Sequence, residues 1–266
     1  MQDFEPSGVV TLTTDLGHKG PYVATMKGVM LARFPGVRVV DLTHDILVHW
    51  PAEAGFWLRR SFRYFPAGTV HVAVVDPAGR AGRDVLVIEH EGHCFVVPDN
   101  GLLGQLDPET STVHRLDGRR TPSLGLPTPS ATFHGRDIFA PLGADLASGR
   151  LRPDAVGPRI HELVPSWLEP AEVVRGEIRG SVITTDNFGN LITNVEEALL
   201  GQFTQPQVVI TGKVVPVRTT YAEASPGEYL ALVNAFGVLE VACAEESAAA
   251  GLGVERGTPV TVRERP

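Results

Sequence analysis

The first part of the chain alternates between two patterns of apolar positions. Runs rich in β-branched residues are typical of strands, whereas periodic segments that open with proline and close on a Pro-Gly or Pro-Ala-Gly turn are typical of helices. The expected strands are Val9 to Thr14, Val37 to Leu42 and Val70 to Val75, and the expected helices are Pro21 to Phe34 and Pro51 to Tyr64. This order predicts a sheet with parallel strands that is covered by helices on both faces.

Three further elements are expected before the pattern changes. Two β-like runs, Val85 to His90 and Cys94 to Val97, flank a turn at Glu91-Gly92. A helix is expected from about Ile138 to Ala147, and Asp137 is its expected N-cap because a carboxylate there can accept hydrogen bonds from the first free N–H groups.

The second part of the chain contains only short β-branched runs. Gly, Asn and Pro turns separate them, which indicates an antiparallel barrel or sandwich. The runs are Val173 to Ile178, Ser181 to Thr185, Leu191 to Val195, Val208 to Ile210, Lys213 to Val217, Tyr229 to Val233, Leu239 to Ala242 and Pro259 to Val262. The segment from Arg152 to Pro170 is rich in proline and suits a linker. We therefore expect an α/β domain over residues 1–165 and a β domain over residues 171–266.

Composition narrows the expected partner to a small molecule. The 266 residues are 43% hydrophobic, and a formal charge of −8 with a pI of about 5.6 argues against a nucleic-acid or anionic-membrane surface, which needs clustered basic side chains. No apolar run approaches the ~20 residues of a membrane-spanning helix, and Met1 to Ser7 lacks the pattern of a signal peptide. Cys94 and Cys243 stand in apolar runs and are expected to be buried free thiols. These features predict a soluble, cytoplasmic protein.

Two carboxylates directly follow expected strands. Asp15 comes after the first strand and Asp76 after the third, and ligands bind beyond the carboxyl ends of such strands. Asp15 suits the two hydroxyls of a ribose, although a turn-forming carboxylate would look the same. Asp76 has Arg80 and Arg83 near it in sequence. It is either held by charge-assisted hydrogen bonds or part of a surface salt bridge.

Two segments of the second part combine amides with aromatic side chains. Residues 184–190 place Asp186, Phe188 and Asn190 around a glycine, and Asn234-Ala-Phe-Gly237 repeats the pairing. An aromatic face and an amide that both donates and accepts hydrogen bonds suit an adenine ring. A plain hairpin turn would give the first segment the same composition.

The stretch from Thr132 to Pro141 brings an aromatic ring, an imidazole, a glycine, a guanidinium and a carboxylate into succession. His134 stands out because an imidazole titrates near neutral pH and can act as a base, an acid or a fixed donor. Taken alone, it suits a packed or capping residue as well as a catalyst. The function therefore depends on which partners the fold brings to it.

Several other classes of site lack support. Four histidines and an aspartate could suggest a metal site: His44, Asp45, His49, His90 and His93. They do not have the spacing of a zinc site, and no HExxH helix or cysteine pair occurs. The chain also lacks the Gly-x-Ser-x-Gly, Walker and Gly-x-Gly-x-x-Gly motifs. We expect no metal and no cofactor.

Taken in order, the motifs resemble one family, the S-adenosyl-L-methionine hydroxide adenosyltransferases, which are water-using relatives of the fluorinase and chlorinase. The motifs are Thr13-Thr-Asp-Leu-Gly17, Asp41-Leu-Thr-His-Asp-Ile46, His71-Val-Ala-Val-Val-Asp-Pro77, Pro98-Asp-Asn-Gly101, Phe133-His-Gly-Arg-Asp-Ile-Phe139, Asp186-Asn-Phe-Gly-Asn190 and Asn234-Ala-Phe-Gly237. The resemblance implies a Rossmann-like, largely parallel sheet in the first domain and an antiparallel β-barrel in the second. It also implies a homotrimer with active sites between subunits, and hydrolysis of S-adenosyl-L-methionine to adenosine and L-methionine.

The resemblance also assigns roles to residues. The family's catalytic triad falls on Asp76, Arg83 and His134, and whether Asp76 or His134 acts as the base stays open. Because the halogenating relatives lack the histidine, His134 favours water over halide. The residues expected to contact the substrate are Asp15, Tyr22, Trp50, Phe133, Gly135, Asp186, Phe188, Asn190, Asn234, Ala235 and Glu240, with the main chain near Cys243 and Glu245 beside the adenine. Among these, Asp15 would hold the ribose, and Asp186 the methionine ammonium.

Three departures from the family pattern keep two alternatives open. Residues Ala78 to Gly82 replace the usual Gly-Val-Gly loop, Gly20 stands where an acidic residue is common, and Ala235 replaces a usual serine. The alternatives are a halide-using adenosyl transferase and a non-catalytic protein that binds adenosine or S-adenosylmethionine.

Overall fold

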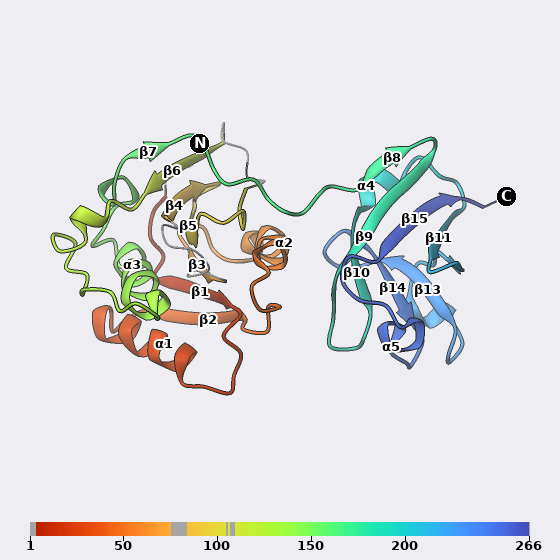
Figure 1. Cartoon of the computed structure of the whole chain (residues 1–266), viewed down its shortest axis with the longest axis horizontal. Helices are drawn as coiled ribbons and strands as arrows, with labels where there is room; N and C mark the ends of the chain where they lie inside the picture. The colour runs from red at the N-terminus through yellow and green to blue at the C-terminus, as the bar shows by residue number, and fades with distance from the viewer. Residues whose placement is uncertain (1–3, 76–83, 105, 107–109, 266) are drawn as a thin grey trace. The chain divides into compact units, whose positions relative to one another are not determined.

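The chain forms two compact units, Met1–Leu168 and Glu169–Pro266, each with its own sheet and core (Figure 1). The structure is a computed structural model, and it describes residues 4–75, 84–104, 106 and 110–265. Asp76, Arg83 and the loop of Ala78 to Gly82 lie outside the described residues.

A seven-stranded mixed sheet forms the centre of the described part of the first unit, in the order β2-β1-β3-β5-β4-β6-β7. Its strands are β1 (Val9–Thr14), β2 (Arg38–Thr43), β3 (Val70–Val74), β4 (Val85–His90), β5 (His93–Pro98), β6 (Ser111–Arg115) and β7 (Arg159–Ile160). The pairs β1–β2, β1–β3 and β3–β5 are parallel, whereas β4–β5, β4–β6 and β6–β7 are antiparallel. The sheet is therefore parallel in only one half. The reason is the two-residue turn at Glu91 and Gly92, whose φ angles of 49° and 76° fold β4 back against β5 as a hairpin.

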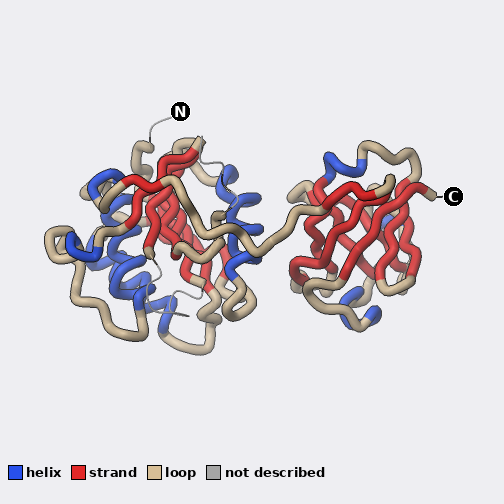
Figure 2. The backbone as a smooth tube through the Cα atoms, turned by 45° about the horizontal axis from the view of Figure 1, so that its top comes forward, coloured by secondary structure: helices blue, strands red, loops and turns tan. Residues whose placement is uncertain are grey.

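Helices cover both faces of this sheet, as the sequence pattern predicts (Figures 1 and 2). α1 (Tyr22–Arg33) and α3 (Ala140–Ala147) pack on one face, and α2 (Pro51–Ser61) packs on the other. The apolar strands supply both cores by alternation: Val72 of β3 joins the cluster that contains Met30 of α1, and its neighbour Ala73 joins the cluster that contains Leu58 of α2.

The helix expected to begin near Ile138 begins earlier and in a different form. A π-helical turn, Gly135–Phe139, runs directly into α3. Asp137 is therefore not an N-cap; it is buried inside this turn. Its carboxylate accepts hydrogen bonds from the backbone N–H and hydroxyl of Ser130 and from Arg136. The hydrogen bonds from Arg136 and Ser130 hold the pKa of Asp137 well below its usual range.

The described part of the second unit is one nearly closed antiparallel sheet with the character of a barrel. Its strands are β8 (Glu172–Val174), β9 (Glu177–Thr185), β10 (Leu191–Glu196), β11 (Pro206–Ile210), β12 (Lys213–Pro216), β13 (Tyr229–Val233), β14 (Val238–Cys243) and β15 (Pro259–Glu264). Along the order β12-β11-β15-β9-β10-β14-β13 every ladder is antiparallel. The ends of the sheet approach each other where the N–H of Arg218, just after β12, donates to the carbonyl of Ala231 in β13 at 2.8 Å.

Two strand boundaries in this unit differ from the expected ones. The run Val173 to Ile178 is broken by a hairpin turn, since Arg175 and Gly176 have φ angles of 54° and 81°. The run Ser181 to Thr185 is the second half of one long strand, β9, which continues through Gly180. A β-carbon on Gly180 would lie 2.6 Å from the side chains of both Asn194 and Val195, so glycine permits the close packing of β10 here.

Short helices complete the described chain. They are α4 (Glu197–Leu200), α5 (Ala248–Leu252) and the 3-10 turns Phe62–Tyr64, Gly118–Arg120, Pro153–Ala155 and Tyr221–Glu223. None of the helices described is long and apolar enough to cross a membrane. Cys94 and Cys243 are buried free cysteines, as predicted.

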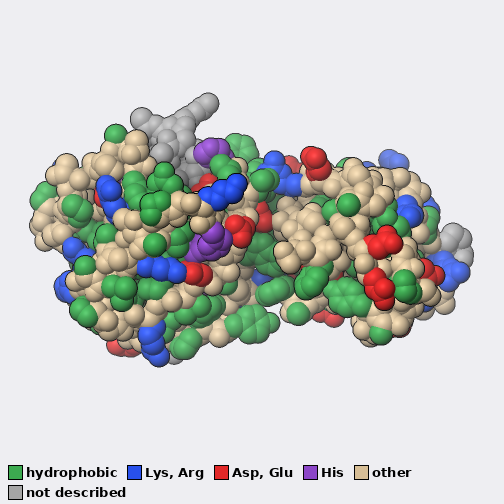
Figure 3. Space-filling view, turned by 90° about the horizontal axis from the view of Figure 1, so that it is seen from below, with side chains coloured by type: hydrophobic (Ala, Val, Ile, Leu, Met, Phe, Trp, Pro, Cys, Tyr) green, Lys and Arg blue, Asp and Glu red, His purple; other side chains and the backbone are tan. Residues whose placement is uncertain are grey.

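On the face drawn in Figure 3, the described Lys and Arg side chains lie among acidic and apolar ones. This view presents no continuous basic surface of the kind that binds nucleic acid.

Candidate active site

The strand order of the first unit changes direction between β1 and β3. From β1 the chain passes to β2 on one side and then to β3 on the other, with α1 and α2 on opposite faces. Ligands of open α/β sheets bind at such a switch point, beyond the carboxyl ends of the strands. Asp15 directly follows β1, and β3 ends at Val74, two residues before Asp76.

Asp15 is tied to the loop that follows β2. Its Oδ2 atom accepts a hydrogen bond from the backbone N–H of His49 at 3.1 Å. The end of β1 also contacts the first residue after β2, since Thr14 Oγ1 lies 2.9 Å from Nδ1 of the buried His44. Trp50 follows His49 and stands at the start of α2. The β1 and β2 loops therefore form one platform that carries Asp15 and Trp50.

Gly135 places His134 beside the end of β3. A β-carbon on this glycine would lie 3.1 Å from Sδ of Met26 in α1 and 3.4 Å from Cγ1 of Val74, so the π-helical turn packs closely against both elements. His134 occupies the position just before that turn and is partly exposed. Within the described part of the chain, no hydrogen bond or ion pair to its imidazole is observed. The ring is therefore available to a ligand.

Aromatic contacts surround Phe133, the residue before His134. The rings of Tyr22 and Phe133 meet edge to face with centroids 5.4 Å apart, and the guanidinium of Arg136 lies 5.3 Å from the centroid of Phe133. Arg136 and Asp137 brace the turn through their mutual ion pair. Of the expected residues in this unit, the structure thus gathers Phe133, His134, Gly135 and Tyr22 around one turn.

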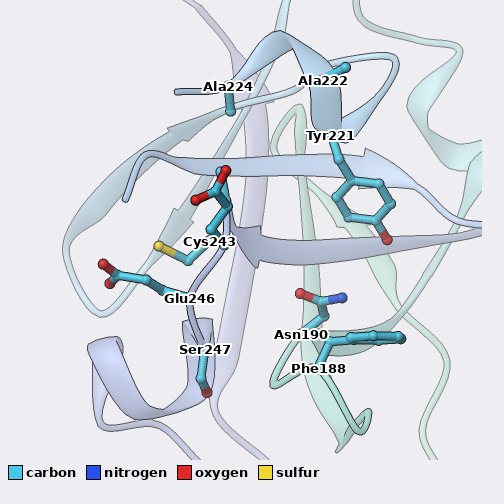
Figure 4. A pocket seen from close by; sticks show the side chains of 10 residues that line it. Phe188, Asn190, Tyr221, Ala222, Ala224, Cys243, Glu246 and Ser247 are labelled. Carbon is cyan, nitrogen blue, oxygen red and sulfur yellow. The ribbon is translucent and has the colours of Figure 1, made fainter. Parts of the chain in front are cut away.

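In the second unit, a pocket of about 670 Å³ opens between the β9–β10 turn and the end of β14 (Figure 4). It is lined by Phe188, Asn190, Tyr221, Ala222, Ala224, Cys243, Ala244, Glu245, Glu246 and Ser247. Four of these, Phe188, Asn190, Cys243 and Glu245, are the residues that the family resemblance places around adenine. The Phe188 ring is 78% exposed, so it presents a flat apolar face to the pocket without being part of the core.

Asp186 builds the turn that holds this side of the pocket. Its Oδ1 accepts the backbone N–H groups of Phe188 and Asn190 at 2.9 and 2.8 Å, and its Oδ2 accepts from Nδ2 of Asn190 at 3.0 Å. The last bond fixes the orientation of the Asn190 amide, because a carboxylate oxygen only accepts. Asp186 thus has a structural duty beside the role with the substrate ammonium that the resemblance assigns to it.

Behind the pocket wall lies a buried carboxylate, Glu240. It is 3% exposed and accepts hydrogen bonds from the hydroxyl of Tyr221 and from Nδ2 of Asn234. Burial raises the pKa of Glu240, and burial together with the bond to Glu240 raises the pKa of Tyr221. Asn234, Glu240 and the exposed Ala235 are not among the described residues that line the pocket.

Tyr221 is one of several pocket residues that were not expected from the sequence. It begins a 3-10 turn whose capping box joins Thr220 and Glu223. The Thr-x-x-Glu spacing is a visible signal for such a turn, but it says nothing about a pocket. Among the described residues there is no group of three or more His, Cys, Asp and Glu side chains that could hold a metal ion.

Comparison with known families places the chain in one of them. Residues 10–157 match the N-terminal domain of the SAM hydroxide adenosyltransferases, and residues 180–261 match the C-terminal domain of the same family. The chain therefore belongs to the SAM hydroxide adenosyltransferase family.

Individual relatives agree with this placement. A protein of Thermus thermophilus named (R)-S-adenosyl-L-methionine hydrolase is 39% identical, and the match covers 94% of this chain and 98% of that protein. A fluorinase of Actinoplanes is 29% identical, with 96% and 97% covered. A crystal structure of an uncharacterized conserved protein from Thermotoga maritima superposes with a TM-score of 0.86 at 30% identity, covering 96% of this chain and 99% of that one.

Proposed function

We propose that the protein hydrolyses S-adenosyl-L-methionine to adenosine and L-methionine. The observation that carries the proposal is the 39% identity, over nearly the whole chain, to a relative named as such a hydrolase. The fluorinase relative is less similar, at 29%. The accessible imidazole of His134 supports the choice of water over halide.

The reaction needs an activated nucleophile and little else. The sulfonium leaves as the neutral thioether of methionine, so no acid has to protonate the leaving group. Water must attack the ribose C5′ carbon in line with the breaking C–S bond and release one proton. General-base help with such a proton is typically worth about 100- to 10,000-fold in rate. His134, Arg83 and Asp76 would orient the water and take the proton.

The remaining residues would bind the two ends of the substrate. In this proposal Asp15 holds the ribose hydroxyls, Phe188 and Asn190 hold the adenine, and Asp186 accepts the methionine ammonium. Tyr22, Trp50 and Phe133 would wall the site, and Gly135 would leave room for the substrate. Asn234 and Glu240 would lie on the barrel stretch that lines the site, and Ala235 would lie near the methionine end. No cofactor takes part.

We also propose the finer architecture that the family resemblance implies. The parallel half of the first sheet, β2-β1-β3-β5, is its Rossmann-like part. The active form is a homotrimer whose sites lie between subunits. Native mass spectrometry of the full chain tests the assembly: a mass three times 28.6 kDa is expected, and a monomer would contradict it.

A product assay tests the reaction. Purified protein is incubated with S-adenosylmethionine in buffer free of halide, and chromatography is expected to show adenosine and methionine in equal amounts. A parallel incubation with chloride or fluoride should yield no 5′-halo-5′-deoxyadenosine. Formation of the halide product would support the halide-using alternative, and tight adenosine binding without any turnover would support the binding-protein alternative.

A further inference from the structure

The pocket of the second unit contains a tyrosine, Tyr221, whose hydroxyl proton is held by a buried carboxylate. A tyrosine hydroxyl has one proton to donate and lone pairs that accept. The hydroxyl of Tyr221 donates to Oε1 of Glu240, so its one proton is committed to the buried carboxylate. What the hydroxyl then offers to the pocket is an acceptor.

The other contact of Glu240 agrees with this direction of the Tyr221 hydrogen bond. Oε2 of Glu240 accepts from Nδ2 of Asn234 at 3.2 Å. Asn234 cannot turn its amide around, because its Oδ1 accepts the backbone N–H of Phe236 at 2.9 Å. In its ionised form Glu240 has no proton to give, and both of its partners are then donors.

Asn190 presents a second acceptor at the same end of the pocket. One N–H of its amide is used by Asp186, which leaves the carbonyl oxygen and one N–H for a ligand. Figure 4 shows the Asn190 amide between the Tyr221 hydroxyl and the Phe188 ring. A flat ring stacked on Phe188 therefore meets the Tyr221 oxygen, which accepts, and the Asn190 amide, which offers one acceptor and one donor.

Purine bases differ in what they offer at such an edge. Adenine carries an exocyclic amine, which donates, whereas hypoxanthine carries a carbonyl oxygen at the same position, which accepts. We propose that Glu240, by fixing the proton of Tyr221, makes the pocket select a base with an exocyclic amine over one with a carbonyl. Tyr221 is then a specificity residue, and Glu240 is a positioning residue that acts through it. This inference rests on the proposed function, because it takes the pocket to be the adenine site.

Two substitutions separate this role from a purely structural one. Tyr221→Phe removes the hydroxyl and keeps the ring. Glu240→Gln keeps the volume of the side chain, but the amide has only one oxygen that can accept. Asn234 donates to that oxygen, so the NH₂ group of the new glutamine faces Tyr221 and donates to its hydroxyl. The proton of Tyr221 is then released toward the pocket, where a carbonyl can accept it.

Calorimetric titration of the full-length protein with adenosine and with inosine tests the inference without any turnover. The wild type is expected to prefer adenosine. Tyr221→Phe should weaken adenosine binding by about 10-fold and change inosine binding little, because one hydrogen bond of ordinary strength is lost. Glu240→Gln should weaken adenosine binding and also strengthen inosine binding. Tyr229→Phe, which removes a hydroxyl elsewhere in the same unit, serves as the control and should change neither.

The outcomes distinguish this inference from the proposed function. If the wild type prefers adenosine and the variants shift the preference as described, the inference holds whether or not S-adenosylmethionine is hydrolysed. If both variants lose the two nucleosides in equal proportion, Glu240 has only a structural role and the inference is wrong, even when the wild type is an active hydrolase. Failure of the wild type to prefer adenosine also overturns it.

Discussion

A β-carbon placed on Gly189 would overlap the side chain of Ser247 and lie 2.9 Å from its Cα atom. Gly189 belongs to the β9–β10 turn, and Ser247 caps α5, whose Ala249 N–H donates to the Gly189 carbonyl at 2.9 Å. Ser247 lines the pocket of the second unit, and Gly189 lies between the lining residues Phe188 and Asn190, so this close approach joins two walls of the pocket. The backbone of Gly189 has a φ of 86°, which other residues rarely adopt.

Gly189→Ala should therefore lower the free energy of unfolding by more than an ordinary glycine-to-alanine change at a left-handed position does. The conformational cost is about 1 kcal/mol, and the overlap with Ser247 adds about 1 to 3 kcal/mol. The control is Gly212→Ala, because Gly212 has a φ of 79° with open space around it. This variant should lose only the conformational part of the free energy of unfolding. Scanning calorimetry measures the loss of stability in each variant, and titration with adenosine measures the effect on binding. Equal losses in the two variants would show that the Ser247 contact does not matter.

Asp15 gives a prediction about the ribose. A carboxylate that accepts two hydroxyls loses most of that binding when it becomes alanine, so Asp15→Ala should weaken adenosine by about 10-fold or more. The wild type should lose affinity on passing from adenosine to 2′,3′-dideoxyadenosine, whereas the variant should hardly distinguish them. Asp154→Ala, which removes an exposed carboxylate of the same unit, is the control. If the variant discriminates as strongly as the wild type, Asp15 serves only the His49 turn.

The fold of both units followed from the sequence wherever local pattern decided it. The strands β1, β4 and β13 have the expected ends, because β-branched runs bounded by turn residues determine them. The direction of strand pairing could not be predicted in the same way, since the hairpin at Glu91-Gly92 makes half of the first sheet antiparallel. Elements without a strong apolar run, such as β6 and the Tyr221 turn, were also missed. Their stability comes from tertiary packing, which local pattern does not contain.

The site divides in the same way. Motifs pointed to Phe188, Asn190 and His134 as candidates because their chemistry is visible in the residue types. The buried network of Glu240, Tyr221 and Asn234 depends on contacts between strands and loops far apart in sequence, so no motif could reveal it. The prediction that Asp137 is an N-cap was wrong, because an aspartate that caps a helix and one that accepts hydrogen bonds from a preceding loop look the same in sequence. The domain ranges 1–165 and 171–266 and the roles of the site residues stay predictions.

A histidine pair in the core predicts how stability responds to acid. His71 is fully buried, with Nδ1 2.8 Å from the hydroxyl of Thr11 and Nε2 3.1 Å from Nδ1 of His93. Burial, and then the charge of His93, lower the pKa of His71 to about 3. Because this pKa lies below the unfolded value of about 6.5, the folded state binds fewer protons. The stabilisation is therefore present above pH 6.5 and is lost as the pH falls toward 3.

His71→Gln should remove this dependence on pH. The variant should be less stable than the wild type at pH 7.5, where the bond to Thr11 is lost, yet its free energy of unfolding should fall less steeply between pH 6.5 and 4. The three tryptophans, at positions 50, 57 and 167, all lie in the first unit, so their fluorescence in urea reports on it. His161→Gln, an exposed histidine, is the control and should keep the wild-type slope. A slope unchanged in His71→Gln would contradict the assignment.

His134 carries the strongest prediction about catalysis. If its imidazole polarises the attacking water or accepts its proton, His134→Ala should lower kcat for S-adenosylmethionine by about 100- to 10,000-fold while adenosine affinity changes less than about 3-fold. The position before the π-helical turn makes no side-chain capping bond, so the fold should tolerate the change. His161→Ala is again the matched control. A wild-type rate in His134→Ala would remove this residue from the mechanism and leave Asp76 as the candidate base. A loss of rate that chloride restores, with 5′-chloro-5′-deoxyadenosine as the product, would instead mean that the imidazole serves mainly to keep halide out.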